Sequence, residues 1–133
     1  MSSRERRLYT NDVSELRKMS AWWREWVASA DCDTEVQERG ELCLNEAVAN
    51  IIGHGGAPCA IAITFDTNGE GVRMTIADDG APFDPVTYPA PVLPRRLDEA
   101  RPGGLGIYIL RTYADVVQYS RVDGWNELTL TFS

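Results

Sequence analysis

The spacing of apolar residues predicts a first helix near the start of the chain. It would begin after Asn11 or Asp12, either of which can cap a helix N-terminus, and run to about Ala30. One face is apolar, because hydrophobic residues return every three or four positions. These residues are Val13, Leu16, Met19, Trp23, Trp26 and Val27. Trp22 falls beside this face, so we expect it to be partly exposed and to mark a partner or dimer surface. The two tryptophans within the face should pack in the core.

A second helix is predicted from Asp33 or Thr34 to about Ile52. Glu35 would lie in its first turn, where an acidic side chain is favourable. Glycines and a proline in residues 53–58 would end it. Its apolar face comprises Val36, Cys43, Ala47, Val48, Ile51 and Ile52.

The rest of the chain alternates apolar and polar residues with the period of two that is typical of strands. Residues 60–65 and 72–76 alternate on either side of a glycine-containing turn, which predicts a β-hairpin. Residues 116–121 and 127–132 form a similar pair around an Asp-Gly turn. A third helix is predicted between the hairpins, over residues 104–113.

A proline-rich segment lies before the third helix. Residues 82–102 hold all but one of the 7 prolines and show no helix or strand pattern, so we expect a functional loop such as a lid over a site. Residues 1–10 are expected to be a flexible start. The whole chain, residues 1–133, is predicted to be a single α+β domain, a two-layer sandwich with helices on one face of a mixed, mostly antiparallel sheet.

Composition narrows the range of functions. With 44% hydrophobic and 25% charged residues, the chain is ordinary for a soluble domain, and no apolar run approaches the roughly 18 residues of a membrane span. A formal net charge of -7 argues against nucleic-acid binding. Cys32, Cys43 and Cys59 lack metal-site spacing and are interpreted as buried, reduced thiols of a cytosolic protein. The charged start is not followed by an apolar stretch, so it is not a secretory signal.

Lysine is nearly absent, and this excludes two kinds of nucleotide site. Lys18 is the only lysine and falls in the first predicted helix. A P-loop needs its lysine inside a glycine-rich loop, and a eukaryotic-type protein kinase needs one on a strand. If this chain binds a nucleotide, then magnesium, backbone amides and arginines must offset the phosphate charge.

Glu46 and Asn50 lie four residues apart on one face of the second predicted helix. Asn50 stands among apolar neighbours although asparagine is a mediocre helix former, which suggests a polar task. Its amide oxygen suits magnesium, an ion that keeps waters and takes phosphate oxygens, and Glu46 could accept a proton from an attacking hydroxyl or water. Taken alone, a solvated helix face with Asn50 exposed is the simpler explanation.

Two glycine clusters follow. Asp78 precedes a turn at Gly80, where a carboxylate can accept a hydrogen bond from an exocyclic amine and glycine lets a flat ring approach; taken alone, this is an ordinary turn. Residues 103–106 (GGLG) begin the third predicted helix, whose free amides suit a phosphate. The alternative is a flexible entry to a packed helix, although Gly106 in the first turn costs about 1 kcal/mol relative to alanine.

In combination these motifs resemble those of the GHKL ATPase superfamily. Residues 46–50 resemble its N-box, and residues 76–85 resemble its first glycine box in the variant found in anti-sigma-factor serine kinases. Residues 103–107 resemble the second glycine box, and residues 121–130 resemble the closing hairpin of that subfamily. The match extends from about Thr34 to the end of the chain.

The resemblance implies a Bergerat-type fold with ATP and Mg²⁺ between the second helix and the lid. Carried over by position, Glu46 is the general base and Asn50 the magnesium ligand. Asp78 would contact the adenine amino group, and Gly80 would line the base. Three further residues would meet the phosphates: Gly104, Leu105 and Gly106.

The resemblance also implies partners. Members of this subfamily bind a sigma factor, phosphorylate a serine of a STAS-domain anti-anti-sigma protein, and commonly form homodimers. We therefore expect a cytoplasmic, ATP-dependent serine kinase and anti-sigma factor, with neither nucleic acid nor membrane as a partner.

Two departures from the family pattern favour an alternative function. Pro82 stands where many relatives have the last glycine of the first box, and Gly53 stands where a basic residue often follows the N-box. The alternative is a nucleotide-binding module that controls a partner without phosphoryl transfer. A sensor histidine kinase fragment fits less well, because His54 is the only histidine and nothing before Asp33 offers a dimerisation hairpin with a phospho-accepting histidine.

Overall fold

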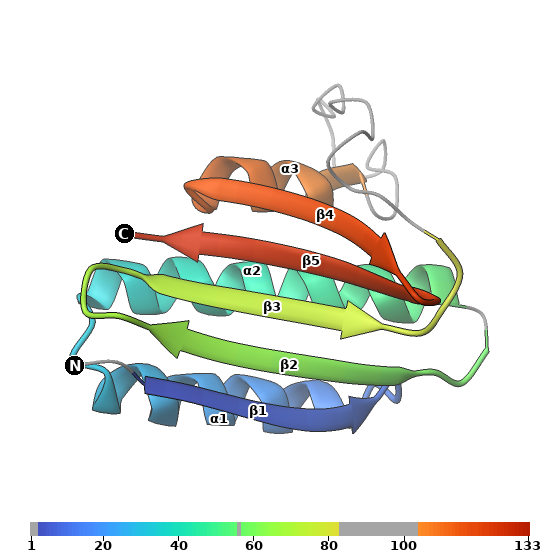
Figure 1. The fold of residues 1–133 in the computed structure, drawn as a ribbon, viewed down its shortest axis with the longest axis horizontal. Coiled ribbons are helices and arrows are strands. Elements are labelled where there is room, and N and C mark those ends of the chain that lie inside the picture. Colours follow the sequence, from blue (N-terminus) through green and yellow to red (C-terminus); the bar gives the residue numbers. More distant parts are fainter. Residues whose placement is uncertain (1–2, 56, 83–103) are drawn as a thin grey trace.

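The computed structural model describes residues 3–55, 57–82 and 104–133, which form one antiparallel sheet with helices on a single face (Figure 1). In chain order the elements are β1 (Ser3–Thr10), α1 (Glu15–Ser29), α2 (Thr34–Gly55), β2 (Ala60–Thr67), β3 (Val72–Asp78), α3 (Gly104–Tyr113), β4 (Val116–Val122) and β5 (Trp125–Phe132). The strand order is β1-β2-β3-β5-β4, and every neighbouring pair is antiparallel. The predicted α+β sandwich with helices on one face is therefore confirmed, but the described sheet is wholly antiparallel rather than mixed.

The predicted helices and both hairpins are present, with some ends displaced. α1 begins at Glu15 rather than directly after Asn11 or Asp12, because Asp12 closes a turn ahead of the helix. Its Oδ1 atom accepts hydrogen bonds from the Ser14 backbone N at 2.9 Å and from Ser14 Oγ at 2.8 Å. α2 continues to Gly55, beyond its expected end.

Residues 3–10, which the sequence led us to expect as part of a flexible start, form the edge strand β1. All 8 residues of the strand pair in register with β2. Within β1, Tyr9 is the only residue that is even partly buried, so the sequence shows no apolar alternation. The main-chain ladder to β2, rather than burial of side chains, holds such an edge strand in place.

The same strand explains why Trp22 is buried. Its side chain is only 2% exposed, because β1 covers it. The guanidinium carbon of Arg7 lies 4.7 Å from the centre of the Trp22 ring, and the ring centre of Tyr9 lies 6.1 Å away. The expectation that Trp22 is partly exposed and marks a partner or dimer surface is therefore wrong.

An aromatic core lies between α1 and the sheet. The rings of Trp22, Trp23 and Trp26 surround Phe65 of β2, with ring centres 4.2, 5.0 and 5.5 Å from its own. The indole N–H of Trp23 donates a hydrogen bond to the backbone oxygen of Gln37 in α2, at 2.9 Å. The core packing predicted for Trp23 and Trp26 is confirmed.

Helix α2 approaches this core closely at Gly40. A Cβ atom built on Gly40 would lie 2.1 Å from Cζ2 of Trp23, far inside van der Waals contact. Nothing lies within 4 Å of a Cβ atom built on Gly53 in the same helix. Gly40 is therefore required by packing, whereas Gly53 is not.

We predict that Gly40→Ala lowers the free energy of unfolding by about 1–3 kcal/mol, because the added methyl group overpacks the core. Alanine in a helix interior is normally favoured over glycine by up to about 1 kcal/mol, so Gly53→Ala serves as a matched control that should raise stability. Equilibrium urea denaturation measures both changes. Equal stability of the two variants would contradict the packing argument.

Candidate nucleotide-binding site

Three elements bring the predicted site residues to one end of the sheet. α2 and β3 end there, and α3 begins there (Figure 1). Glu46 and Asn50 lie in the second half of α2, Asp78 is the last residue of β3, and Gly80 follows it. The first turn of α3 contains Gly104, Leu105 and Gly106. Apart from Pro82, the predicted lid lies outside the described residues.

Asn50 is buried, with 8% of its surface exposed. Its Nδ2 atom is also buried and has no hydrogen-bond partner among the described residues. A buried amide left unpaired costs about 1–3 kcal/mol, so this side chain does not fit the simpler explanation of a solvated helix face. Glu46, one helical turn earlier, is half-buried. The pair thus offers an amide and a carboxylate that the described fold does not use internally.

Asp78 is buried at the end of β3, with 7% of its surface exposed. Its Oδ1 atom accepts hydrogen bonds from the backbone N of Gly80 at 3.0 Å and from Nδ2 of Asn126 at 3.2 Å. Burial raises the pKa of the Asp78 carboxyl, and these two hydrogen bonds only partly oppose the rise. Because both hydrogen bonds reach Oδ1, Oδ2 is left to accept a hydrogen bond from a ligand amine.

Asn126 is a further polar residue of this site, and we predicted no separate role for it from its place in the sequence. It is 5% exposed and stands opposite Asp78 in the pairing of β3 with β5. Its Nδ2 atom also donates to the backbone oxygen of Ala81 at 2.8 Å, and its Oδ1 atom accepts from the hydroxyl of Tyr119 at 2.6 Å. A signal was present in the sequence, since asparagine is unusual in strands and this one shares the buried face with apolar residues such as Leu128.

The backbone of Gly80 is held from two sides. Its N–H donates to Asp78, and its carbonyl oxygen accepts from Nη1 of Arg121 at 2.9 Å; the same nitrogen donates to Oδ1 of Asn126 at 3.1 Å. A Cβ atom on Gly80 would lie 2.9 Å from Oδ1 of Asp78 and 3.9 Å from Sγ of Cys59. Glycine at this position therefore keeps the carboxylate of Asp78 unobstructed.

The described residues contain no group of three or more His, Cys, Asp or Glu that could hold a metal ion. A magnesium ion near Asn50 would therefore take most of its ligands from a nucleotide and water, which is usual for this ion. The three cysteines are free thiols, as predicted, but only Cys43 is buried, whereas Cys32 and Cys59 are partly exposed. Burial raises the pKa of Cys43 to about 12, so this thiol stays protonated.

Comparisons with known proteins point to one family. A model of the histidine kinase-like ATPase domain matches residues 9–132. The chain is 36% identical to the serine/threonine-protein kinase BtrW of Bordetella bronchiseptica over 135 residues, which is 98% of this chain and 95% of the relative.

A solved structure agrees on the fold. The crystal structure of the RsbU and RsbW domains of Rv1364c from Mycobacterium tuberculosis matches 98% of this chain with a TM-score of 0.65. The sequence identity is 18%, and this chain spans only 32% of the length of that one. The likeness therefore concerns the fold alone.

We predict that Asp78→Asn raises the free energy of unfolding at neutral pH. The pKa of the Asp78 carboxyl is higher in the folded protein than in the unfolded chain, so the folded protein binds the proton more readily. Above that pKa the carboxyl is charged, and the buried charge lowers the free energy of unfolding. The cost disappears as the pH falls, and the gain from the substitution should shrink with it. Urea denaturation of both proteins, from neutral to acidic pH, measures this gain.

Asp123→Asn is the matched control, because Asp123 is exposed in the turn between β4 and β5. This variant should keep the pH dependence of the parent protein. A gain from Asp78→Asn that grows as the pH falls would contradict the assignment of Asp78 as a buried carboxylate.

Proposed function

We propose that this chain, which belongs to the histidine kinase-like ATPase domain family, binds a sigma factor and phosphorylates a serine of a STAS-domain anti-anti-sigma protein. The resemblance of its motifs to the GHKL ATPases is confirmed by the family match. The matches to the ATPase-domain model and, over nearly the whole chain, to a serine/threonine-protein kinase support an ATP-binding protein-serine kinase. The identities of the partners and the roles of individual residues form the proposal.

The observation that supports the proposed site best is the buried amide of Asn50, whose Nδ2 atom has no hydrogen-bond partner among the described residues. Through its amide oxygen Asn50 would hold Mg²⁺ on the nucleotide, at the end of α2 that lies beside the end of β3. When bound, the ion would offset the charge that develops on the transferred phosphate. Asn50 would orient the phosphates through this contact, and no described carboxylate is needed to complete a metal site.

The adenine would lie over the end of β3. Oδ2 of Asp78 would accept a hydrogen bond from the adenine amino group, while Asn126 and Gly80 hold the other oxygen of the carboxylate. Gly80 would line the base, because it has no side chain to obstruct a flat ring. At the other end of the nucleotide, the backbone amides in the first turn of α3 would meet the phosphates, assisted by the helix dipole.

Glu46 would accept the proton of the attacking serine hydroxyl. It lies one helical turn from Asn50 on the same face of α2, so both side chains would face the bound nucleotide. Most of the rate in phosphoryl transfer comes from positioning and electrostatics, and a general base adds to it.

The proposed partners follow from the family resemblance. A formal net charge of -7 does not favour direct contact with nucleic acid. None of the described helices combines the length and the apolar character needed to cross a membrane. We further propose that the protein works in the cytoplasm and as a homodimer.

A second candidate function is regulation by nucleotide-dependent binding without phosphoryl transfer. Gly53 favours this second function. It is exposed and stands where relatives often have a basic residue. The open space around Gly53 would admit a longer side chain, so packing does not require a glycine there. Glu46 favours the kinase, because a protein that only binds a nucleotide needs no general base at this position. Phosphate transfer measured beside nucleotide affinity separates the two functions.

We predict that Glu46→Gln reduces phosphoserine formation on the STAS-domain partner by roughly 100-fold or more, because a general base contributes about 10²–10⁴-fold. The affinity for ATP should not change. Mass spectrometry of the partner after incubation with Mg-ATP measures the product, and calorimetry measures the affinity.

Glu41→Gln is the matched control for this experiment. Glu41 lies on the same helix and forms an ion pair with Arg24 of α1, away from the proposed site. This variant should phosphorylate the partner at the parental rate. Full activity of Glu46→Gln would contradict the role of Glu46 as the base.

We predict that Asn50→Leu abolishes the increase in ATP affinity that Mg²⁺ produces, because leucine has no oxygen to offer the ion. Its stability should be equal to or higher than that of the parent protein, since the substitution removes a buried amide without a partner among the described residues. Titrations with ATP, in the presence of Mg²⁺ and of a chelator, measure the first effect. Retention of the magnesium dependence would show that Asn50 is not the ligand.

A further inference from the structure

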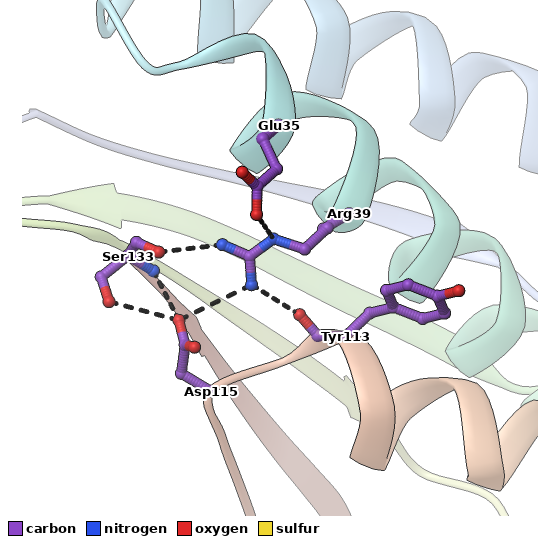
Figure 2. Close-up of polar contacts among 5 residues, drawn as sticks. All are labelled: Glu35, Arg39, Tyr113, Asp115 and Ser133. Atoms are coloured by element: carbon purple, nitrogen blue, oxygen red, sulfur yellow. Dashed lines mark hydrogen bonds and ion pairs between the residues drawn. The ribbon is translucent and has the colours of Figure 1, made fainter.

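Arg39 of α2 connects the helix to the ends of two other elements, far along the chain (Figure 2). Its side chain is 16% exposed. Nη1 donates a hydrogen bond to the backbone oxygen of Tyr113, the last residue of α3, at 2.8 Å. Nη2 donates to the backbone oxygen of Ser133, just after β5, at 2.8 Å.

The carboxylates of Glu35 and Asp115 also lie beside the guanidinium of Arg39 (Figure 2). Asp115 Oδ2 lies 3.7 Å from Nη1 of Arg39 and accepts hydrogen bonds from the backbone N of Ser133 at 2.7 Å and from its Oγ at 3.2 Å. Oε1 of Glu35 lies 3.4 Å from Nε of Arg39, close enough for an ion pair although the geometry does not make a hydrogen bond. The guanidinium also lies 5.9 Å from the ring centre of the buried Phe132.

The contact with Tyr113 caps α3 from another helix. The last carbonyl oxygens of a helix have no partner within it, and a cation beside them interacts favourably with the helix dipole. An arginine can meet the Tyr113 and Ser133 carbonyls with two different nitrogens at once, which the single ammonium group of lysine does less well.

This cap also sets the register between α2 and α3. The two helices pack against each other and run in opposite directions (Figure 1). Tyr113 lies about 13 Å from the start of α3 at Gly104, and Asn50 lies about 16 Å along α2 from Arg39, at a rise of about 1.5 Å per residue. Fixing Tyr113 at Arg39 therefore brings the start of α3 level with the Asn50 end of α2.

We propose that Arg39 is a positioning residue for the phosphates of ATP. By fixing the far end of α3, it holds the first turn of that helix in register with Glu46 and Asn50. The inference rests on the proposed phosphate role of Gly104 to Gly106. It assigns Arg39 a task that a purely stabilising residue does not have: Arg39 should affect the binding of the phosphates and not that of the adenine.

The test compares the affinities for Mg-ATP and for adenosine, measured by calorimetry on the full chain. Arg39→Met should weaken the binding of ATP by roughly 2- to 30-fold, the usual range for coupling through packed elements, and leave the affinity for adenosine unchanged. Arg39→Lys should fall between the parent protein and Arg39→Met. Arg24→Met, which breaks the ion pair of α2 with α1 instead, should leave both affinities unchanged.

The outcomes separate the two proposals. A parent protein that binds ATP no more tightly than adenosine would refute the phosphate role of α3, and the inference about Arg39 with it. If the parent protein prefers ATP but both Arg39 variants keep its two affinities and lose only thermal stability, Arg39 is structural and the inference is wrong. If Arg39→Met does not fold, Arg39→Lys alone tests the inference. Affinities of Arg39→Lys for ATP and adenosine equal to those of the parent protein would overturn the inference about Arg39.

Discussion

The contact between α2 and the aromatic core at Gly40 is the packing constraint on which the rest of the molecule depends. Because the backbone of α2 lies directly against Trp23, the helix is held at a fixed depth over the sheet. Its first half then meets the end of α3 through Arg39, and its second half brings Glu46 and Asn50 to the end of β3. One tightly packed helix thus connects the core, the third helix and the proposed site.

The site end of the molecule keeps polar groups buried at a cost to stability. Asn50 has a buried nitrogen without a partner among the described residues, and burial raises the pKa of Asp78. Both costs are understandable if a nucleotide supplies the missing interactions, because functional sites often retain locally unfavourable groups. The scarcity of lysine fits this design, since the phosphates would be met by backbone amides and a metal ion rather than by an ammonium group.

Much of the fold could be predicted from the sequence, because α2, α3 and both hairpins have clear apolar periods bounded by glycine or proline. The flexible start and the exposure of Trp22 were both predicted wrongly, and for one reason: β1 is held by main-chain pairing that leaves no apolar pattern. The motifs identified Glu46, Asn50 and Asp78, but the role of Asn126 depends on its register opposite Asp78, which no local pattern specifies. The burial of Asn50 likewise became visible only in the fold.

The function that we propose requires this chain to transfer a phosphoryl group from ATP to a serine of a partner protein. The most direct measurement is mass spectrometry of the STAS-domain protein encoded nearest to it, after incubation with the parent protein and Mg-ATP. We expect phosphate on a serine of that partner, formed only when Mg-ATP and this chain are both present. Binding of ATP by the chain without any phosphate on the partner would contradict it.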